Sequence, residues 1–426
     1  MPLTATQAPA PRVTYRAVLG TPHVARLLFG TLTGRMPQGM APVALVLWAT
    51  ATGYGLAFGG LLSALYGISF ALSQPLKGRL MDLYGQRTVH LPAAALNSAS
   101  LLLLPLIGPI ATTKQIMATV VMAGLTAPAL EAGLRALWPS VLPDPRRRHV
   151  ALALDTGSQG LLYITGPLLV ATLTTLHSPA LALMVTAALG MAGTIIVTTS
   201  PPSRHWQRTQ PDPTVESPAR LLGAGFALLC LSLAGVGFAI GTLNVLGVAM
   251  AERHQAEMLS GALPAAFAAG TFLGGLAYGA RTWPGTHTGQ LIAGTAAFTA
   301  SWLPLLLLPG PSAATAAVML PGVFLTVIVT SSYLTCDALT PPGRTSEAYT
   351  WLLLAIGAGQ AAGATAAGHY ANTPLTGAAL PTAGAALALT TLALARARLA
   401  FAQHPTAFPP PPIGDPPCPN HQQSRS

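Results

Sequence analysis

Long, continuous apolar stretches follow one another from residue 24 to residue 395, separated by short polar connections. A helix needs roughly 20 predominantly apolar residues to cross the hydrocarbon core of a bilayer. Only 8% of the 426 residues are charged, whereas about 25% are charged in a typical soluble domain. The stretches do not show the alternating polarity of barrel strands. We therefore predict an all-α membrane protein that crosses the bilayer many times.

Gly, Pro and polar residues divide the apolar sequence into twelve spans. The spans predict twelve transmembrane helices in two six-helix halves, at 24–200 and 221–395. The halves are joined by a cytoplasmic central loop at 201–220, with a tail at 1–23 and a Pro-rich, disordered tail at 396–426. The predicted spans are 24–49, 55–76, 89–109, 115–138, 151–176, 179–199, 221–248, 258–280, 288–309, 313–336, 347–368 and 378–395.

The distribution of basic residues predicts the orientation of these helices. Sixteen Arg and Lys residues lie in the two tails and the even-numbered connections, whereas the odd-numbered connections hold Lys114 and Arg253. Because cytoplasmic loops carry the excess of basic residues, we expect both termini in the cytoplasm of a bacterial plasma membrane. The net charge of +10 then reflects topology and attraction to anionic lipid, and it indicates no nucleic-acid partner.

A charged motif follows the second span and reads Gly78-x-x-x-Asp82-x-x-Gly85-x-Arg87. Gly78 allows two helices to approach closely, and Gly85 permits a tight reversal of the chain. Asp82 and Arg87 are suited to holding the end of a neighbouring helix. The motif resembles the signature loop of the major facilitator superfamily, which lies on the cytoplasmic side between helices two and three.

The resemblance implies that this loop docks near the start of helix eleven and stabilises the outward-open state. In this chain helix eleven starts at Glu347, so Asp82 would face the positive end of that helix while Arg79 or Arg87 pairs with Glu347. Leu83 and Gln86 depart from the family pattern. A partial copy of the motif, Tyr278-Gly279-x-Arg281, closes the eighth span, as expected for duplicated halves. The resemblance is to bacterial drug-efflux-like members.

Ionisable residues inside the spans mark candidate functional positions. Arg35 lies near the middle of the first span, and Glu131 is the carboxylate at comparable depth in the fourth. Two interpretations stay open: a cavity pair that changes partners when substrate or a proton arrives, or a static ion pair that fixes helix packing. We expect Arg135 and Asp155 to form a separate ion pair at the inner gate.

Polar side chains on other spans are candidates for lining the substrate and proton cavity. Each of them is as well explained by hydrogen bonding between helices. These candidates are Gln159, Tyr163, Asn244, Tyr333 and Gln360.

The sequence contains no metal-ligand cluster, phosphate-binding loop or nucleophile motif. We therefore expect no enzyme activity, cofactor or metal. The predicted function is secondary active transport by alternating access, as proton-coupled efflux of small hydrophobic or drug-like molecules by a monomer. The alternative is a transporter-like receptor or sensor, or an uptake facilitator without proton coupling.

Overall fold

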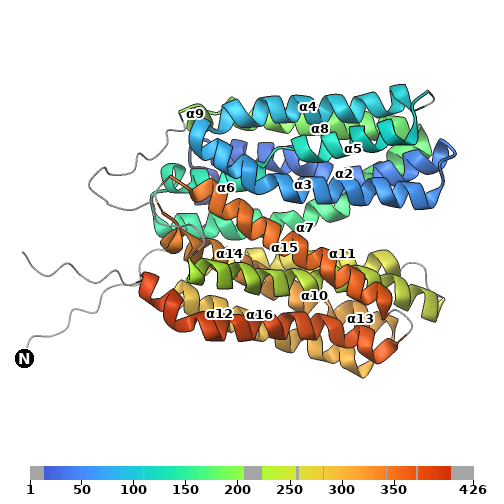
Figure 1. Ribbon diagram of the computed structural model, residues 1–426. Coiled ribbons are helices and arrows are strands. Elements are labelled where there is room, and N and C mark those ends of the chain that lie inside the picture. The colour runs from blue at the N-terminus through green and yellow to red at the C-terminus, as the bar shows by residue number, and fades with distance from the viewer. Residues whose placement is uncertain are drawn as a thin grey trace, which may run out of the picture.

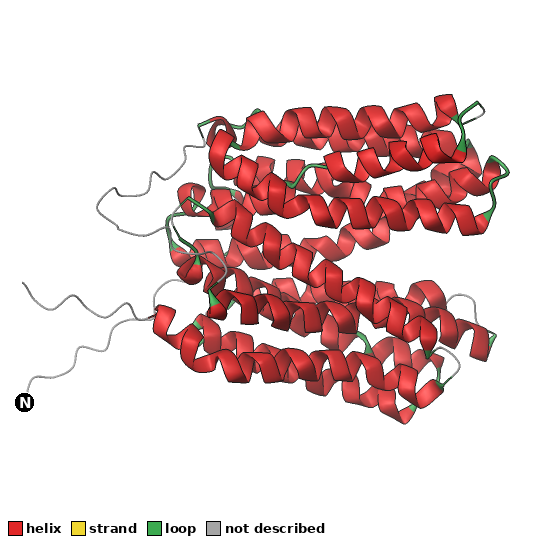
Figure 2. Cartoon of the chain, viewed as in Figure 1, coloured by secondary structure: helices red, strands yellow, loops and turns green. Residues whose placement is uncertain are grey.

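The computed structural model describes residues 14–108, 110–205, 223–255, 259–281, 283–341, 343–370 and 373–403. Within these ranges every regular element is a helix (Figure 2). The residues up to 205 form α1 (Tyr15–Leu19), α2 (Val24–Ala51), α3 (Leu56–Tyr84), α4 (Gln86–Ile107), α5 (Thr113–Thr126), α6 (Leu130–Val141), α7 (Pro145–Leu176), α8 (Pro179–Thr198) and α9 (Pro201–Arg204). The later residues form α10 (Ala224–His254), α11 (Leu259–Gly279), α12 (His287–Trp302), the 3-10 helix η1 (Leu303–Leu307), α13 (Pro311–Ala317), α14 (Met319–Leu339), α15 (Thr345–His369) and α16 (Pro374–Gln403).

Local sequence explains where several helices begin. Asp144 and Ser178 each accept a hydrogen bond from a backbone N–H in the first turn of the helix that follows. A proline occupies the first helical position after each of them, where its missing N–H leaves no hydrogen bond unmade. These signals fix the starts of α7 and α8.

Ten segments of the described chain are long and apolar enough to cross a membrane. The helices α2 and α3, with 28 and 29 residues, match them in length. Figure 1 shows α2 to α5 and α8 in one half of the bundle and α10 to α16 in the other. This is an all-α membrane architecture. The limits proposed for the two halves stay predictions, and most of the predicted central loop and Pro-rich tail lies outside the described residues.

The predicted fourth span is not one continuous helix. It consists of α5 and α6, which are separated at Ala127, Pro128 and Ala129. Proline lacks a backbone donor and clashes with the preceding turn, so the apolar run breaks there. Lys77 of α3 is buried and donates a hydrogen bond to the carbonyl of Ala127, which the break would otherwise leave unpaired. Glu131 therefore lies in the first turn of α6.

Other boundaries differ from the predicted ones. The predicted ninth span ends in η1, and the tenth is divided into α13 and α14. The motif after the second span belongs mostly to α3, which continues to Tyr84. Gly85, with φ of 87°, then separates α3 from α4, so a single glycine makes the turn. α16 continues to Gln403, past the predicted end at 395.

The two halves meet through α7 against α11 and α3 against α15, with α6 and α14 beside them. We call the end of the bundle that carries Arg79, Arg146 and Arg344 the arginine-rich end. Small residues let α7 and α11 approach one another closely. A Cβ on Gly157 of α7 would lie 3.0 Å from Cα of Gly275, and one on Gly160 would lie 2.5 Å from the carbonyl oxygen of Ala268. The halves are thus in direct backbone contact along α7 and α11.

Candidate functional site

Four buried charged side chains from three helices form one ion-pair network. Arg35 of α2 lies 2.6 Å from Glu131 and 3.6 Å from Asp155. Arg135 of α6 lies 2.7 Å from Glu131 and 2.8 Å from Asp155 of α7. Each carboxylate is therefore shared by both guanidinium groups, and the network carries no net formal charge. None of the four side chains is more than 8% exposed.

Local packing explains how the network assembles. Glu131 and Arg135 are four residues apart in α6, so they lie on one helix face. Arg35 is brought to them because α2 packs closely on α6: a Cβ on the neighbouring Gly34 would lie 2.3 Å from the Leu130 side chain. The close contact at Gly34 thus places a cation of α2 beside the first turn of α6.

The sequence predicts two separate pairs, Arg35 with Glu131 and Arg135 with Asp155. Both contacts are present, but the structure joins them into one network. Removing one member of such a buried network leaves an uncompensated charge, at a cost of about 3–5 kcal/mol. Protonating one carboxylate would instead leave the network with one net positive charge. A change in the charge of one member would therefore leave the buried network unbalanced.

Two further candidate residues contact the network. Gln159 of α7 donates a hydrogen bond to Glu131. The guanidinium of Arg135 lies 3.9 Å from the ring centre of Tyr333 on α14, which is a cation–π contact. Tyr333 belongs to the second half of the chain, so the network of the first half reaches across the interface. Within the described atoms, Nε and Nη1 of Arg35 and Oδ1 of Asp155 make no hydrogen bond.

A row of polar residues leads away from the network along α7. Asp155, Gln159 and Tyr163 follow one another at four-residue intervals and share a face of the helix. Asp155 is 1% exposed, Gln159 is half-buried, and Tyr163 is 58% exposed. This face therefore runs from the buried network to accessible surface.

The remaining cavity candidates are not brought to the network by any described contact. Gln360 is half-buried on α15, and its carbonyl lies where α15 packs against Gly241 of α10, inside the second half. The backbone of Asn244 belongs to α10, but its side chain lies outside the described residues. The structure thus groups Arg35, Glu131 and Tyr333 with their neighbours and leaves Gln360 apart.

The gate motif forms a second contact between the halves. Asp82 is 3% exposed, and its carboxylate accepts hydrogen bonds from the backbone N–H groups of Ser346 (3.1 Å) and Glu347 (2.9 Å). These N–H groups belong to the first turn of α15, where free donors and the helix dipole favour an anion. A Cβ on Gly78 would lie 2.3 Å from Oγ1 of Thr350. Gly78 is therefore required for the approach of α3 to α15.

Arginine side chains surround Glu347 at the edge of this contact. Arg79 lies 3.6 Å from its carboxylate, and Arg344 donates to it at 2.7 and 2.9 Å. The hydrogen bonds to Glu347 raise the pKa of Arg344. Arg87 is exposed and makes no ion pair within the described part of the chain. Of the two arginines expected to meet Glu347 from the motif, the structure brings Arg79 to it.

Two contacting residues were not predicted as site residues. Lys77 was counted with the cytoplasmic basic residues, but it is buried beside the break between α5 and α6. Tyr15 of α1 donates hydrogen bonds to the carbonyls of Gly275, at 3.1 Å, and of Leu276 in α11. Burial raises the pKa of Tyr15 to about 12, so its phenol remains a donor at neutral pH. The residues before the first span thus link the two halves.

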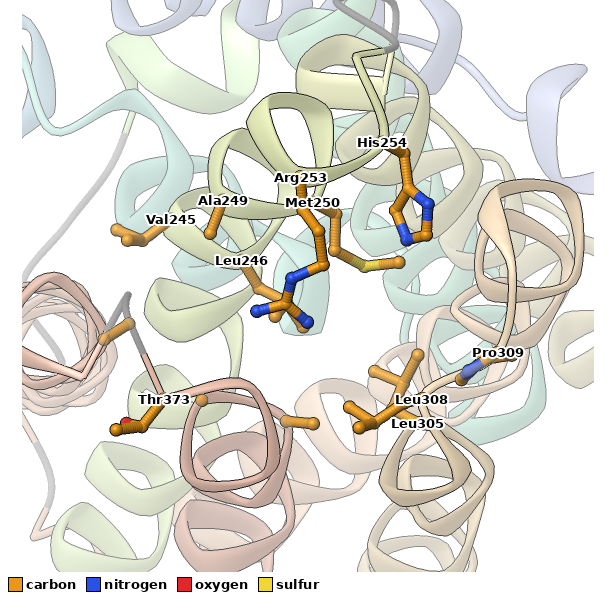
Figure 3. Close-up of a pocket in the computed structure, with 13 residues that line it drawn as sticks. Val245, Leu246, Ala249, Met250, Arg253, His254, Leu305, Leu308, Pro309 and Thr373 are labelled. Carbon is orange, nitrogen blue, oxygen red and sulfur yellow. The ribbon is translucent and has the colours of Figure 1, made fainter.

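A small pocket lies in the second half, away from the network (Figure 3). It is lined by residues of α10, η1, α15 and α16 and of the segments between them, and Arg253 and His254 are the basic residues among them. Its volume is about 40 Å³, enough for a few water molecules at roughly 10–15 Å³ each. It is too small for a cargo molecule. Within the described residues, no group of three His, Cys, Asp or Glu side chains is suited to hold a metal ion.

Three solved structures with the same arrangement of helices are remote in sequence. A bacterial homologue of the iron transporter ferroportin, in its outward-facing state, aligns with a TM-score of 0.66 at 14% identity, covering 88% of this chain and 99% of that one. The human organic anion transporter MFSD10 (TETRAN) aligns with a TM-score of 0.60 at 18% identity, covering 90% of this chain and 100% of that one. A variant of the E. coli fucose:proton symporter FucP aligns with a TM-score of 0.69 at 13% identity, covering 87% of this chain and 98% of that one.

No curated protein matches the sequence in a direct comparison. Residues 27–364 match the family profile described as Major Facilitator Superfamily. The match covers more than half of the chain and includes both the network and the gate motif. It agrees with the helical arrangement shared with the three solved transporters. The chain is therefore a transporter rather than an enzyme, with the fold of alternating-access secondary transporters, and it belongs to the major facilitator superfamily.

Proposed function

We propose that this protein exports small, hydrophobic or drug-like molecules from a bacterial cell in exchange for protons. In this proposal the protein acts as a monomer in the plasma membrane, with the arginine-rich end and both termini in the cytoplasm. The excess of basic residues at that end supports this orientation. The observation that carries the proposal is the buried network of Arg35, Glu131, Arg135 and Asp155.

The network supports proton coupling through its charge balance. With both carboxylates ionised, two cations and two anions compensate one another in a region of low dielectric constant. A proton on Glu131 removes one anion that contacts both Arg35 and Arg135. The network then holds an uncompensated positive charge, which favours a rearrangement of α2 against α6. Protonation is thereby linked to a movement of the helices that carry the site.

Tyr333 supports a link between this movement and the second half. Its ring packs against the guanidinium of Arg135 across the interface. A change of partners by Arg135 would alter this contact, which depends on the position of the cation over the ring. The charge state of the first half would therefore affect how α14 packs against it.

The charge of the network also supports the proposed class of cargo. The four charges cancel, so an uncharged cargo meets no net field from them. Nε and Nη1 of Arg35 make no hydrogen bond within the described atoms, although Nη1 lies 3.6 Å from Asp155, so a polar acceptor on the cargo could bind there. The exposed Tyr163 on the same row of α7 offers an aromatic face. A mainly apolar molecule with one or two acceptors fits these groups.

Proton coupling is tested with Glu131→Gln in proteoliposomes. Glutamine preserves the size of the side chain and one acceptor oxygen but cannot carry the coupling proton. We expect the variant to exchange a fluorescent hydrophobic dye down its concentration gradient, but to lose accumulation driven by a pH gradient. The matched control is Asp144→Asn, because Asp144 is an exposed carboxylate outside the network.

The result separates the proposal from its alternatives. Normal pH-driven accumulation by Glu131→Gln would refute proton coupling at this residue. Dye binding without flux in the wild-type protein would favour a receptor, and flux that is insensitive to pH would favour a facilitator. Misfolding of the variant would indicate that the network is a static ion pair, as expected from the cost of about 3–5 kcal/mol for breaking a buried pair.

A further inference from the structure

A second pocket lies at the arginine-rich end, between the two halves. It is formed by the first turns of α7 on one side and by the link between α11 and α12 on the other. Its volume is about 240 Å³, six times that of the pocket in Figure 3. The polar and aromatic residues that line it are Arg146, His149, Arg281, Trp283, His287 and Gln290.

The ionisable side chains of this pocket are all basic. Arg146 and His149 come from the first half, and Arg281 and His287 come from the second. No lining residue is acidic. Within the described part of the chain neither arginine forms an ion pair, although five other arginines of the same end or of the network do. The pocket therefore has two guanidinium groups without a counter-anion.

The nearby carboxylates already have other partners. Asp144, at the start of α7, lies 3.9 Å from Arg147 and caps its own helix. Asp337 accepts a hydrogen bond from the hydroxyl of Tyr349. Neither of them lines the pocket. A counter-anion would therefore have to come from outside the described chain.

The walls of the pocket are held by contacts around Tyr278. The ring of His149 packs on that of Tyr278 with centroids 4.5 Å apart, and one of its ring nitrogens lies 3.2 Å from the Tyr278 carbonyl. The indole N–H of Trp283 donates to the same carbonyl at 3.0 Å. Gln290 accepts from the hydroxyl of Tyr278 at 2.5 Å and donates to the carbonyl of Trp283 at 3.0 Å. The pocket is thus preformed.

We infer that this pocket binds a phosphate group, and that the bound group joins the two halves at the arginine-rich end. Guanidinium groups bind phosphate oxygens through pairs of charge-assisted hydrogen bonds. Here Arg146 and Arg281 come from opposite halves, so one anion between them would be held by both. Bound phosphate then stabilises the state in which this end is closed, since separating the halves would pull the two arginines apart.

The phosphate can belong to a lipid headgroup or to a free ion. Trp283 is 45% exposed at the edge of the pocket, and tryptophan is enriched at the level of lipid headgroups. The volume of the pocket also admits a free phosphate ion. Both sources use the same two arginines, so a single set of variants serves both tests. Binding at this pocket does not depend on the proposed proton coupling or on the cargo.

The first test measures the thermal stability of the purified full-length protein in detergent. We compare sodium phosphate with sodium chloride at equal ionic strength. If free phosphate binds, the wild-type Tm rises with phosphate concentration by roughly 2–4 °C. The rise is lost in Arg146→Gln and in Arg281→Gln. It is retained in the matched control Arg147→Gln, which changes the neighbouring arginine of the same run, outside the pocket.

The second test uses vesicles of phosphatidylcholine with or without phosphatidylglycerol. Ser346 is fully buried between the halves, so Ser346→Cys, with the native cysteines replaced, reports opening of the arginine-rich end through its labelling rate. If a headgroup binds, phosphatidylglycerol slows labelling several-fold. This slowing disappears when Arg146→Gln or Arg281→Gln is added, and it persists with Arg147→Gln.

Either response, with this dependence on the two arginines, supports the site and identifies the source of the phosphate. A response that is equal in all variants would reflect general charge effects and would overturn the inference. The absence of both responses would overturn it as well. Neither measurement involves transport, so failure of the proposed export function would leave these results unaffected.

Discussion

The contact of Asp82 with the start of α15 leads to a quantitative prediction for Asp82→Asn. Asparagine keeps one acceptor oxygen and places an NH₂ group toward the second backbone donor, so one of the two hydrogen bonds is lost. A hydrogen bond to a charged group contributes about 1.5–3 kcal/mol, and a carboxylate at a helix N-terminus contributes about 0.3–1 kcal/mol more. The closed state of the arginine-rich end should therefore lose about 2–4 kcal/mol relative to the open one.

This loss corresponds to a shift of about 30- to 1,000-fold in the equilibrium between the two states. The assay is the labelling rate of Ser346→Cys by a reagent added at the arginine-rich end. We expect labelling of Asp82→Asn to be faster by at least one order of magnitude, with normal expression, because the core of each half is unchanged. Transport should fall sharply, since one state of the cycle is depopulated.

Two controls separate this contact from general effects of charge. Asp144→Asn removes an exposed carboxylate that caps its own helix, and it should label like the wild-type protein. Glu347→Gln removes the ion pairs to Arg79 and Arg344, which are 39% and 30% exposed, and exposed pairs contribute about 0–1 kcal/mol. Only the pair with Arg79 joins the two halves, because Arg344 and Glu347 are three residues apart at the start of α15, so the effect on labelling should be less than tenfold. If Asp82→Asn labelled no faster than Asp144→Asn, the contact would not control this end of the protein.

Three further substitutions test other contacts. Gly78→Ala should open the arginine-rich end and impair transport, because its Cβ would lie 2.3 Å from Oγ1 of Thr350. The control is Gly67→Ala on the same helix, whose Cβ would meet no atom within 4 Å, and it should leave the labelling rate of Ser346→Cys unchanged. Tyr15→Phe removes the hydrogen bonds to α11 and should speed labelling of Ser346→Cys by about 2- to 10-fold, equivalent to about 0.5–1.5 kcal/mol. Wild-type labelling would contradict this. Tyr333→Leu should lower the free energy of unfolding by about 2 kcal/mol, because the cation–π contact with Arg135 is lost. Tyr333→Phe keeps the ring and loses only a hydroxyl that makes no hydrogen bond within the described atoms, so its free energy of unfolding should change little. Equal stability of the two variants would refute this role of the ring.

The sequence predicted the fold class well because membrane spans are encoded by local composition. A run of about 20 apolar residues indicates a helix wherever it lies in the fold. The gate motif was equally accessible, since Gly78, Asp82 and Gly85 act within one short segment, and the partner at the start of α15 followed from the resemblance. Local signals of this kind do not depend on how distant helices are rotated.

Contacts between helices were harder to predict. Hydropathy does not register a backbone break inside an apolar run, so the division at Pro128 was missed although proline itself signals it. Arg135 and Glu131 lie four residues apart on α6, so the spacing alone places them on one helix face. The joining of Asp155 to Arg35 depends instead on the relative rotation and depth of α7 and α2, which one sequence does not specify. The contact of Tyr15 with α11 depends on a chain segment whose polar composition indicated only a tail.

The backbone contact of Gly157 with Gly275 has a consequence for how the halves separate. When two helices with interdigitated side chains move apart, those side chains must change rotamer, and each change adds to the free-energy barrier for the movement. Along this seam there are no side chains at the closest points, because Gly157 and Gly160 face Gly275 and the backbone of Ala268. The surfaces are smooth, so α7 and α11 can roll or slide over one another without rearranging interlocked groups. The two halves can therefore change their relative orientation along this contact while their backbones stay close together.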